Sequence, residues 1–169
     1  MIKVADINDI TKLEILINSA YRGESGRKGW TTESDILSGI RIDSLELFAI
    51  INSVNSTIFK YELTDVILGC VLLEEKIDKL YLGMFCVSPT EQNSGIGKKI
   101  LQFATNFAIS KGLPKIVMTV IATRTELIDW YKRHDFVDSG KREPFPDGYE
   151  QYILSGETLE FMVLEKQIC

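Results

Sequence analysis

The sequence predicts an α/β (α+β) protein that folds as a single domain over residues 1–169. Three observations support this prediction: helical apolar spacing near the N-terminus, a series of short β-branched segments through the middle, and a glycine-rich turn leading from the last of these into an amphipathic helix. A chain of 169 residues that is 45% hydrophobic is long enough for one core and too short for a comfortable two. No repeat, low-complexity tract or linker marks a second domain.

The N-terminal part is expected to contain one strand and two helices. The strand covers residues 2–5, a first helix follows with Asn8 or Asp9 as its cap, and a second helix covers residues 32–40. Apolar residues of the first helix recur at helical spacing, namely Ile10, Leu13, Ile17 and Ala20. Between the helices, segment 21–31 is polar and rich in glycine, which predicts a loop long enough to be functional.

A meander of strands is expected in the middle of the chain, at residues 47–51, 56–61, 66–73 and 79–87. The helix after the glycine turn places its apolar residues on one face, namely Ile96, Ile100, Phe103, Ala104 and Phe107. The remaining elements are a buried strand at 116–122, a short helix at 123–133 and two final strands near 136–141 and 159–166.

The glycine turn is the most informative segment. It follows the apolar strand that ends at Val87 and has the pattern Gln-x-x-Gly-x-Gly from Gln92 to Gly97. The first N–H groups of a helix lack intrahelical partners and the helix dipole is positive there, so this turn suits a diphosphate. Glycine at 95 and 97 lets the main chain approach an anion. A dinucleotide fingerprint is disfavoured because Ile100 replaces its third small residue, and the P-loop pattern is absent.

A second block follows the strand at 116–122 and ends in Trp130-Tyr131-Lys132-Arg133-His134-Asp135-Phe136. Together with the glycine turn, this aromatic-Tyr-x-x-x-x-Phe ending resembles the GNAT superfamily of acyl-CoA-dependent N-acetyltransferases. Two positions depart from the family pattern. Asp135 stands where Gly is usual, although Asp tolerates the left-handed conformation of a helix end. Arg124 stands where many members carry an Asn that contacts the cofactor, so that contact is not carried over.

The resemblance covers most of the chain and is strongest from residue 80 to residue 136. It implies the acyl-CoA N-acyltransferase fold: a single mixed, mostly antiparallel sheet of six to seven strands with four helices, whose two central parallel strands splay apart at their C-terminal ends. The slot between these strands would take acetyl-CoA as cosubstrate. The cofactor-binding residues that the resemblance implies are Phe85, Cys86, Val87, Gln92, Asn93, Ser94, Gly95, Ile96, Gly97 and Lys98.

The implied activity is direct transfer of an acetyl group from acetyl-CoA to a primary amine of a small molecule in a ternary complex. The expected catalytic groups are the backbone N–H of Val87, which would stabilise the oxyanion, and the hydroxyl of Tyr131, which would protonate the departing thiolate. Thr119, near the position where some members carry a Glu, cannot act as a base. The open alternatives for the base are a water chain, Glu33, Asp35, Glu74 and Glu75. A protein or peptide N-acetyltransferase and a catalytically silent acyl-CoA sensor are the alternative functions.

The acceptor is expected between the 21–30 loop and the 141–149 segment. Its candidate ligands are Tyr21, Arg22, Arg27, Trp30, Arg142 and Phe145. Arginines would suit an acceptor that carries a carboxylate, because the guanidinium binds carboxylates bidentately. Aromatic side chains would equally suit an apolar or cationic amine. The sequence leaves both classes open.

Composition limits the partners, metal sites and cellular compartment that we expect for this protein. A net charge of −5 and a pI near 5.0 argue against a nucleic-acid partner. Cys70, Cys86 and Cys169 are an odd number without a C-x-x-C pair, and there is one His, so we expect a reducing compartment and no metal site. The absence of a signal or a membrane-length apolar run predicts a cytoplasmic protein without a membrane partner. A homodimer is compatible with the sequence, through a sheet edge bearing Phe161 and Val163.

Overall fold

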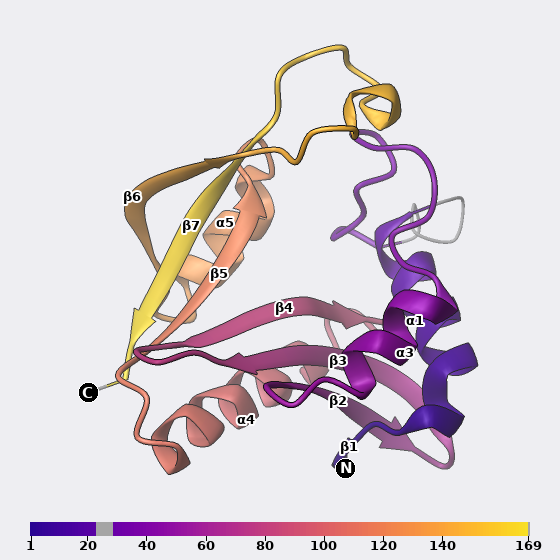
Figure 1. Cartoon of the computed structure of the whole chain (residues 1–169), viewed down its shortest axis with the longest axis vertical. Coiled ribbons are helices and arrows are strands. Elements are labelled where there is room, and N and C mark those ends of the chain that lie inside the picture. The colour runs from indigo at the N-terminus through magenta and orange to yellow at the C-terminus, as the bar shows by residue number, and fades with distance from the viewer. Residues whose placement is uncertain (23–28, 169) are drawn as a thin grey trace.

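The computed structural model describes residues 1–22 and 29–168. Its centre is one seven-stranded sheet with the order β1-β2-β3-β4-β5-β7-β6, in which β4 and β5 are parallel and the other neighbours are antiparallel (Figure 1). The strands are β1 (Ile2–Val4), β2 (Ser56–Leu63), β3 (Val66–Glu75), β4 (Leu80–Val87), β5 (Lys115–Ile121), β6 (Val137–Pro144) and β7 (Glu160–Gln167). The mixed, mostly antiparallel sheet predicted from the sequence is confirmed.

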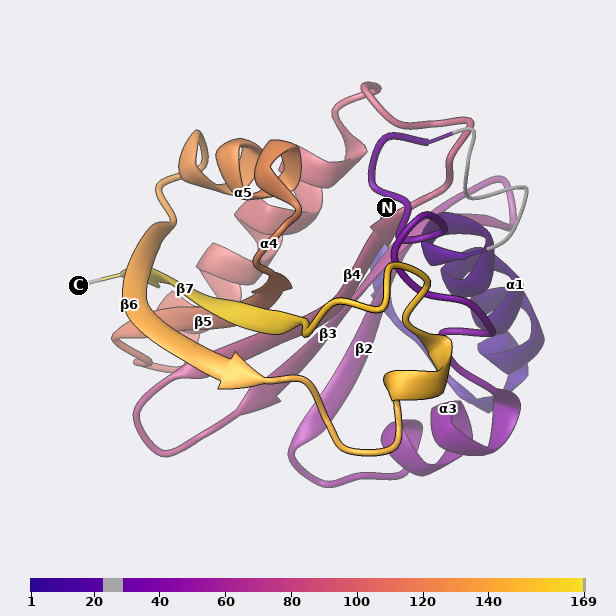
Figure 2. The same cartoon turned by 90° about the horizontal axis from the view of Figure 1, so that it is seen from above.

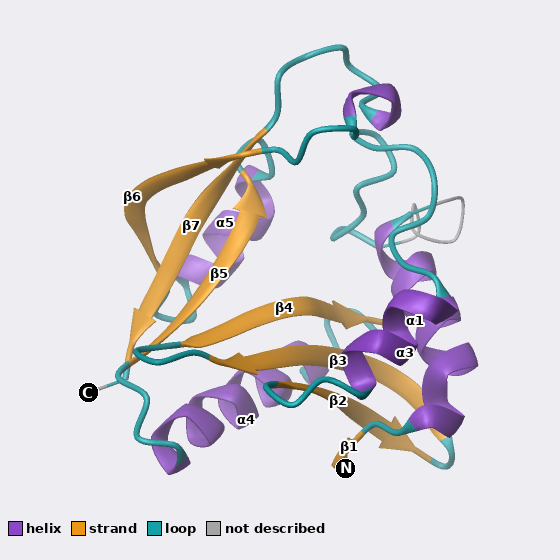
Figure 3. Cartoon of the chain, in the orientation of Figure 1, coloured by secondary structure: helices purple, strands orange, loops and turns teal. Residues whose placement is uncertain are grey.

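Helices cover the sheet on both faces (Figure 3). The described α-helices are α1 (Ile10–Tyr21), α3 (Ser44–Ile51), α4 (Ile96–Ser110) and α5 (Thr125–Lys132), with 3-10 turns at Ile7–Asp9 and Glu150–Tyr152. The helices α1 and α3 pack on one face over a core that includes Leu13, Ile17 and Leu47. On the other face, α4 and α5 share a larger core built around Ile100 and Ile128.

A β-bulge in β4 moves its side chains from one core to the other. Leu80 and Leu82 face the α4 and α5 core, whereas Met84 and Cys86, which have the same parity, face the α1 and α3 core. Side chains of a regular strand alternate, so an extra residue is needed for this change of face. The register to β3 shifts at this point, and Met84 has a φ of 42°. The bulge turns Phe85 toward α5.

The parallel strands β4 and β5 separate soon after they meet. Their register contains only Leu80 with Ile116 and Tyr81 with Val117, at the N-terminal ends of both strands. Beyond these pairs the strands diverge, as Figure 1 shows, while β4 stays paired to β3 and β5 to β7. The predicted splay of the central parallel strands is therefore confirmed.

Two expected elements differ from the structure. Residues 47–51 form the end of α3 rather than a strand, because Asp43 caps Glu46 N–H and the Glu46 side chain accepts the N–H of Asp43 in a complete capping box. Residues 32–40 form turns rather than a helix. There the Thr32 hydroxyl accepts the N–H of Ser34, a local bond that competes with helix formation.

The strand expected at a sheet edge is internal. Because β7 lies between β5 and β6, Phe161 and Val163 have neighbouring strands on both sides, and the edges of the sheet are β1 and β6. The proposed dimer edge through these residues is therefore wrong. Over residues 1–22 and 29–168, none of the helices has the length and apolar character needed to span a lipid bilayer.

Candidate active site

The glycine turn folds as the sequence predicts, with Gly95 as the N-cap of α4 at a φ of 84°. The first intrahelical bond runs from Lys99 N–H to Gly95 O at 3.1 Å, so the preceding three N–H groups of the helix have no i−4 acceptor. A Cβ built on Gly95 would meet no atom within 4 Å, and one on Gly97 would lie 3.4 Å from the Trp130 ring. The helix start is therefore open to a ligand.

A cavity of about 300 Å³ lies at this helix start. Eight of the ten predicted cofactor-binding residues line it: Phe85, Cys86, Val87, Gln92, Asn93, Gly95, Gly97 and Lys98. Ser94 and Ile96 do not line it. Ile96 is 4% exposed and belongs to the core.

Aromatic rings form one wall of this cofactor cavity. Trp130 stacks on Phe85 at 5.9 Å between centroids, contacts Trp30 at 6.2 Å and lies 4.3 Å from the His134 ring. Burial and the nearby Lys98 lower the pKa of His134. Sequence reasoning placed Trp130 and His134 on the helix but not in the cavity. The available signal was the spacing of four residues, which brings His134, in the turn after α5, back beside Trp130 on the helix.

Gln92 has a second role that the glycine motif did not suggest. Its Oε1 accepts the N–H of Trp30 at 3.0 Å, and its Nε2 donates to Thr31 Oγ1 at 2.7 Å and to Val87 O at 3.3 Å. One side-chain amide therefore connects the end of β4 with the segment that precedes Glu33. We name residues 29–34 the cover segment, because Trp30 and Thr31 line the cofactor cavity.

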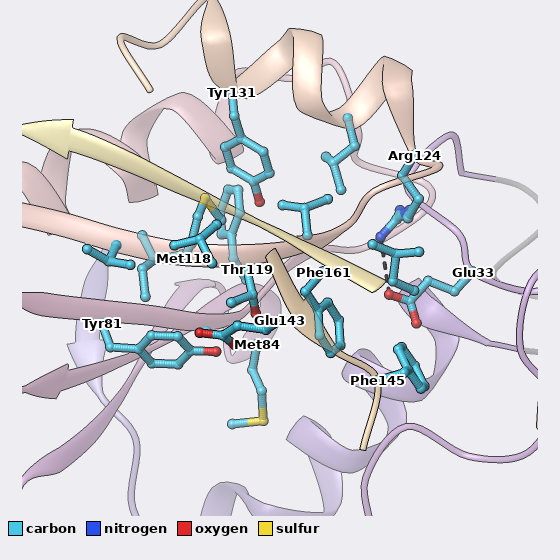
Figure 4. A pocket seen from close by; sticks show the side chains of 18 of the residues that line it. Glu33, Tyr81, Met84, Met118, Thr119, Arg124, Tyr131, Glu143, Phe145 and Phe161 are labelled. Atoms are coloured by element: carbon cyan, nitrogen blue, oxygen red, sulfur yellow. Dashed lines mark hydrogen bonds and ion pairs between the residues drawn. The ribbon is translucent and has the colours of Figure 1, made fainter. Parts of the chain in front are cut away.

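A buried cluster of charges also holds the cover segment. Glu33 accepts from Arg22 Nη2 at 3.0 Å on one carboxylate oxygen and from Arg124 Nη1 at 3.2 Å on the other (Figure 4). Arg124 also donates to Thr31 O, and Arg22 donates to Ser38 O at 3.3 Å. The departure from the family pattern at Arg124 thus ties the start of α5 to the cover segment.

A second, larger cavity of about 650 Å³ opens on the other side of the splay. Side chains from β4, β5, β6 and β7 line it, together with the cover segment and the β6–β7 connection. Five residues line both cavities: Tyr21, Phe85, Arg124, Leu127 and Tyr131. The two cavities therefore meet where β4 and β5 separate. We call the larger one the acceptor cavity.

Tyr131 stands at the junction of the two cavities. Its side chain is 4% exposed, and Figure 4 shows its hydroxyl pointing into the acceptor cavity. The ring is fixed by Trp130 at 5.2 Å and Phe136 at 5.7 Å between centroids. Burial raises the pKa of Tyr131 well above its usual value, partly offset by the charge of Arg124. The hydroxyl therefore keeps its proton over the physiological range.

The backbone N–H of Val87 points toward the space between β4 and β5, where these two strands separate. Ser88 N–H donates to Leu68 O on β3 at 2.8 Å, and Cys86 is in register with Cys70. Bonding directions alternate along antiparallel strands, so the residue between them directs its N–H away from β3. Phe85 and Val87 are expected cofactor-binding residues, but their backbone carbonyls already have partners: Phe85 O accepts from Tyr21 Oη at 2.8 Å, and Val87 O accepts from Gln92 Nε2 at 3.3 Å.

The buried thiols of Cys70 and Cys86 lie 3.6 Å apart on facing strands. The hydrogen bond with Cys86, together with burial, raises the pKa of Cys70. Cys86 lines the cofactor cavity while its side chain remains 5% exposed. The two thiols therefore belong to the α1 and α3 core, and Cys86 also forms part of the wall of the cofactor cavity.

The predicted acceptor residues are distributed unevenly. Tyr21, Arg22 and Phe145 line the acceptor cavity, and Trp30 lines the cofactor cavity. Arg142 lines neither; it forms two bonds of 2.9 Å with the Asp138 carboxylate. Arg27 lies outside the described residues. Arg22 and Arg142 are thus each already bound to a carboxylate of the protein. This counts against the expectation that these arginines bind an acceptor carrying a carboxylate.

Most of the candidate bases are engaged as well. Glu33 lies between two arginines, and Glu74 and Glu75 form ion pairs with Lys76 at 2.7 Å and Lys111 at 2.9 Å. Glu33 and Glu74 line the acceptor cavity, as does Thr119, whereas Glu75 and Asp35 do not.

Asp135 adopts the left-handed conformation expected at a helix end, with a φ of 71°. The N–H groups of His134 and Phe136 both donate to Tyr131 O, at 2.9 and 3.2 Å. These bonds satisfy carbonyls at the end of α5. The substitution of Asp for the usual Gly therefore preserves the helix ending that positions Tyr131.

Comparisons with known proteins agree with this geometry. A family profile described as "Acetyltransferase (GNAT) family" matches residues 15–136, well over half of the chain. The comparison with curated proteins found no match.

Solved structures share the fold at low sequence identity. The protein smu.2055 of Streptococcus mutans UA159 has a TM-score of 0.77 at 17% identity, covering 100% of this chain and 99% of that one. The ribosomal-protein-S18-alanine N-acetyltransferase of Escherichia coli has a TM-score of 0.73 at 12% identity, covering 99% and 93%. The protein yncA of Salmonella typhimurium, solved with its cofactor acetyl-CoA, has a TM-score of 0.72 at 16% identity, covering 100% and 94%. The splayed strands, the glycine turn and the family match together show that this chain belongs to the GNAT family of acetyltransferases.

Proposed function

We propose that this protein transfers an acetyl group from acetyl-CoA to a primary amine of a small molecule, directly within a ternary complex. The observation that supports this most strongly is the meeting of two cavities at the splay, with Tyr131 at their junction. A donor in one cavity and an acceptor in the other would place the reacting groups side by side. Direct transfer then needs no covalent enzyme intermediate.

The residues present fit acetyl-CoA. The open N–H groups at the start of α4 and the nearby Lys98 suit a diphosphate. The apolar wall of Phe85, Leu127 and Trp130 suits the uncharged arm of the cofactor. The acetyltransferase family of the chain and the acetyl-CoA in yncA support the same cosubstrate.

Two groups of the chain fit the chemistry of acetyl transfer. The Val87 N–H faces the gap beside β5, where it can donate to the oxyanion that develops when the amine attacks the thioester. Tyr131 lines both cavities and stays protonated over the physiological range, so its hydroxyl can give a proton to the departing thiolate. The proton that the attacking nitrogen loses on forming the amide balances this transfer and restores the hydroxyl. Collapse of the tetrahedral intermediate then releases the acetylated amine and CoA.

A backbone bridge between residues 36–38 and 152–154, beside the acceptor cavity, favours a small molecule over a polypeptide as the acceptor. Ser38 N–H donates to Tyr152 O at 2.8 Å and Leu154 N–H to Ile36 O at 2.9 Å, which pairs Leu37 with Ile153. Figure 2 shows the β6–β7 connection reaching the segment before α3, and a buried cluster of Leu37, Ile121 and Leu159 lies between them. An extended peptide would have to open this bridge.

The first test is calorimetric titration with acetyl-CoA of the wild type and of two variants. Gly95→Asp places a carboxylate at the start of α4, and Gly112→Asp makes the same change at its other end. Both glycines have positive φ and open space around an added Cβ, so backbone strain is matched. We expect binding by the wild type and Gly112→Asp and its loss in Gly95→Asp. No binding by folded wild type would overturn the proposal.

A second test identifies the acceptor class by release of free CoA thiol in the presence of amines and peptides. Small amines that accelerate release support the proposal. Acceleration by peptide N-termini alone would favour a peptide N-acetyltransferase. If acetyl-CoA binds and no amine or peptide accelerates release, the protein is an acyl-CoA sensor rather than an enzyme.

A further inference from the structure

Glu143 differs from the other carboxylates of the acceptor cavity. Three of them have cationic partners: Glu33 with Arg22 and Arg124, Glu74 with Lys76 at 2.7 Å, and Glu165 with Lys115 at 3.6 Å. Glu143 forms neither an ion pair nor a side-chain hydrogen bond with any residue that the structure describes. A carboxylate without a partner in a cavity is available to a ligand.

The sheet register directs this carboxylate into the acceptor cavity. Glu143 on β6 is paired with Phe161 on β7, which in turn is paired with Ile121 on β5, so the three form a row across the sheet. All three line the acceptor cavity. Figure 4 shows Glu143 and the hydroxyl of Tyr81 pointing into the same space. Its neighbour Arg142 has the opposite parity and binds Asp138 instead.

Aromatic rings surround the same end of the cavity. Phe145 stacks on Phe161 with centroids 4.9 Å apart, and Tyr149 meets the Phe145 ring edge-on at 5.8 Å. A carboxylate beside aromatic faces suits an organic cation, because the charge and the ring quadrupoles both favour a positive group. The apolar surface of the rings would contact the carbon body of that cation.

The cations of the cavity give little support for an acceptor that carries a carboxylate. Arg22 and Arg124 are bound to Glu33, and Arg41 lies over the Tyr21 ring at 5.5 Å. Lys141, two residues before Glu143 and on the same strand face, is exposed and forms no ion pair within the described chain. Arg41 likewise forms no ion pair within the described chain, so Lys141 and Arg41 are the two cations that a carboxylate-bearing acceptor would use, and both are included in the test.

Resting on the proposed acetyl transfer, we propose that Glu143 binds the acceptor in its ammonium form, before that nitrogen loses a proton to solvent and attacks the thioester. The acceptor is then a cationic amine with an apolar or aromatic body and no carboxylate. Glu143 is thus a binding residue that touches substrate. Because Glu143 is exposed in the free protein, a charge pair of this kind contributes up to about 1 kcal/mol, which corresponds to roughly 5-fold in affinity.

The test measures amine affinity in Glu143→Gln and in the control Glu160→Gln. Glu160 is an exposed carboxylate on β7 whose neighbour Phe161 faces the cavity, so its own side chain has the opposite parity. The probes are phenethylamine, phenylalanine and 2-phenylethanol, which carry an ammonium, an ammonium with a carboxylate, and no charge. Binding is followed by ligand-observed NMR with CoA present, which requires no turnover.

We expect phenethylamine to bind best to the wild type, to lose about 2- to 5-fold in affinity in Glu143→Gln, and to be unchanged in Glu160→Gln. Equal binding of phenethylamine by wild type and Glu143→Gln would overturn the proposal, as would failure of phenethylamine to bind. Preferential binding of phenylalanine would overturn the carboxylate-free class, and Lys141→Gln and Arg41→Gln would show which cation holds its carboxylate. Calorimetry with acetyl-CoA tests the proposed function separately, because Glu143 does not line the cofactor cavity.

Discussion

Gln92 binds the backbone N–H of Trp30 at 3.0 Å, although the two residues are 62 positions apart in the chain. The same amide reaches Thr31 and Val87. A residue of the glycine motif therefore fixes the cover segment against the strand that carries the proposed oxyanion donor. The glycine turn, the end of β4 and the cover segment are joined by the hydrogen bonds of one side chain. A substitution in the turn should therefore change the position or stability of the cover segment.

Replacing Gln92 with Met keeps the side-chain volume and removes these bonds. We expect a loss of about 1–3 kcal/mol in the free energy of unfolding, because the Trp30 N–H and Val87 O lose their side-chain partner in a partly buried place. Urea denaturation measures this loss. The control is Gln102→Met on the exposed face of α4, where the side chain bonds only to Asn106 at 3.2 Å. Equal losses in both variants would contradict the structural role.

Tyr131→Phe tests the proposed proton donor. We expect kcat to fall about 10²- to 10⁴-fold with little change in acetyl-CoA affinity, since only the hydroxyl is removed. The raised pKa of Tyr131 means that its protonated form persists to higher pH, so wild-type kcat should show no loss from tyrosine ionisation below its usual pKa of 10.0. The pH profile of kcat measures this. Tyr61→Phe, a buried tyrosine on β2 outside both cavities, should keep full activity.

The chain contains one histidine, so its imidazole gives a single titration curve by NMR. In the free protein the His134 pKa should lie below 6.5, because burial and then the charge of Lys98 disfavour the protonated ring. A diphosphate beside Lys98 would add negative charge, so acetyl-CoA should raise this pKa. Lys98→Gln should raise it in the free protein as well. An unchanged titration with acetyl-CoA bound would place the diphosphate elsewhere.

Glu33→Gln tests the buried charge cluster. Removing the carboxylate leaves Arg22 and Arg124 without their shared anion, and side chains of all three are 10% exposed or less. Breaking a buried pair of this kind costs about 3–5 kcal/mol. Urea denaturation should show this loss, whereas Glu74→Gln at the more exposed pair with Lys76 should cost less than about 1 kcal/mol. A small effect at Glu33 would mean that water replaces the carboxylate.

The sequence was sufficient for those features that local patterns encode. Strand periodicity predicted most of the strands, and the family resemblance carried by the glycine turn and the block of residues 130–136 implied eight residues that line the cofactor cavity. The tolerance of Asp135 for positive φ followed from its side chain alone.

Features that depend on long-range contacts were beyond the reach of the sequence. Residues 47–51 are a different case: they are apolar and strand-like, and the local capping box of Asp43 and Glu46 could have indicated the helix from the sequence. The ion pairs of Arg22 and the three bonds of Gln92 join segments far apart in the chain, so no local pattern reports them. Glu143 is one of many acidic residues in the sequence, and the register with Phe161 is what places it in the cavity.

The early separation of β4 and β5 gives the molecule two additional sheet edges in its interior. Exposed edges are a hazard because a foreign strand can pair with them and begin aggregation. Here α5 and the cover segment border the gap, so a whole polypeptide strand has little access, while a slender molecule bearing its own amide groups can enter. The Phe85 and Val87 carbonyls have side-chain partners, whereas the Val87 N–H points away from β3 and is open to a ligand. Occupancy of the gap between β4 and β5 should therefore slow amide hydrogen exchange at Val87.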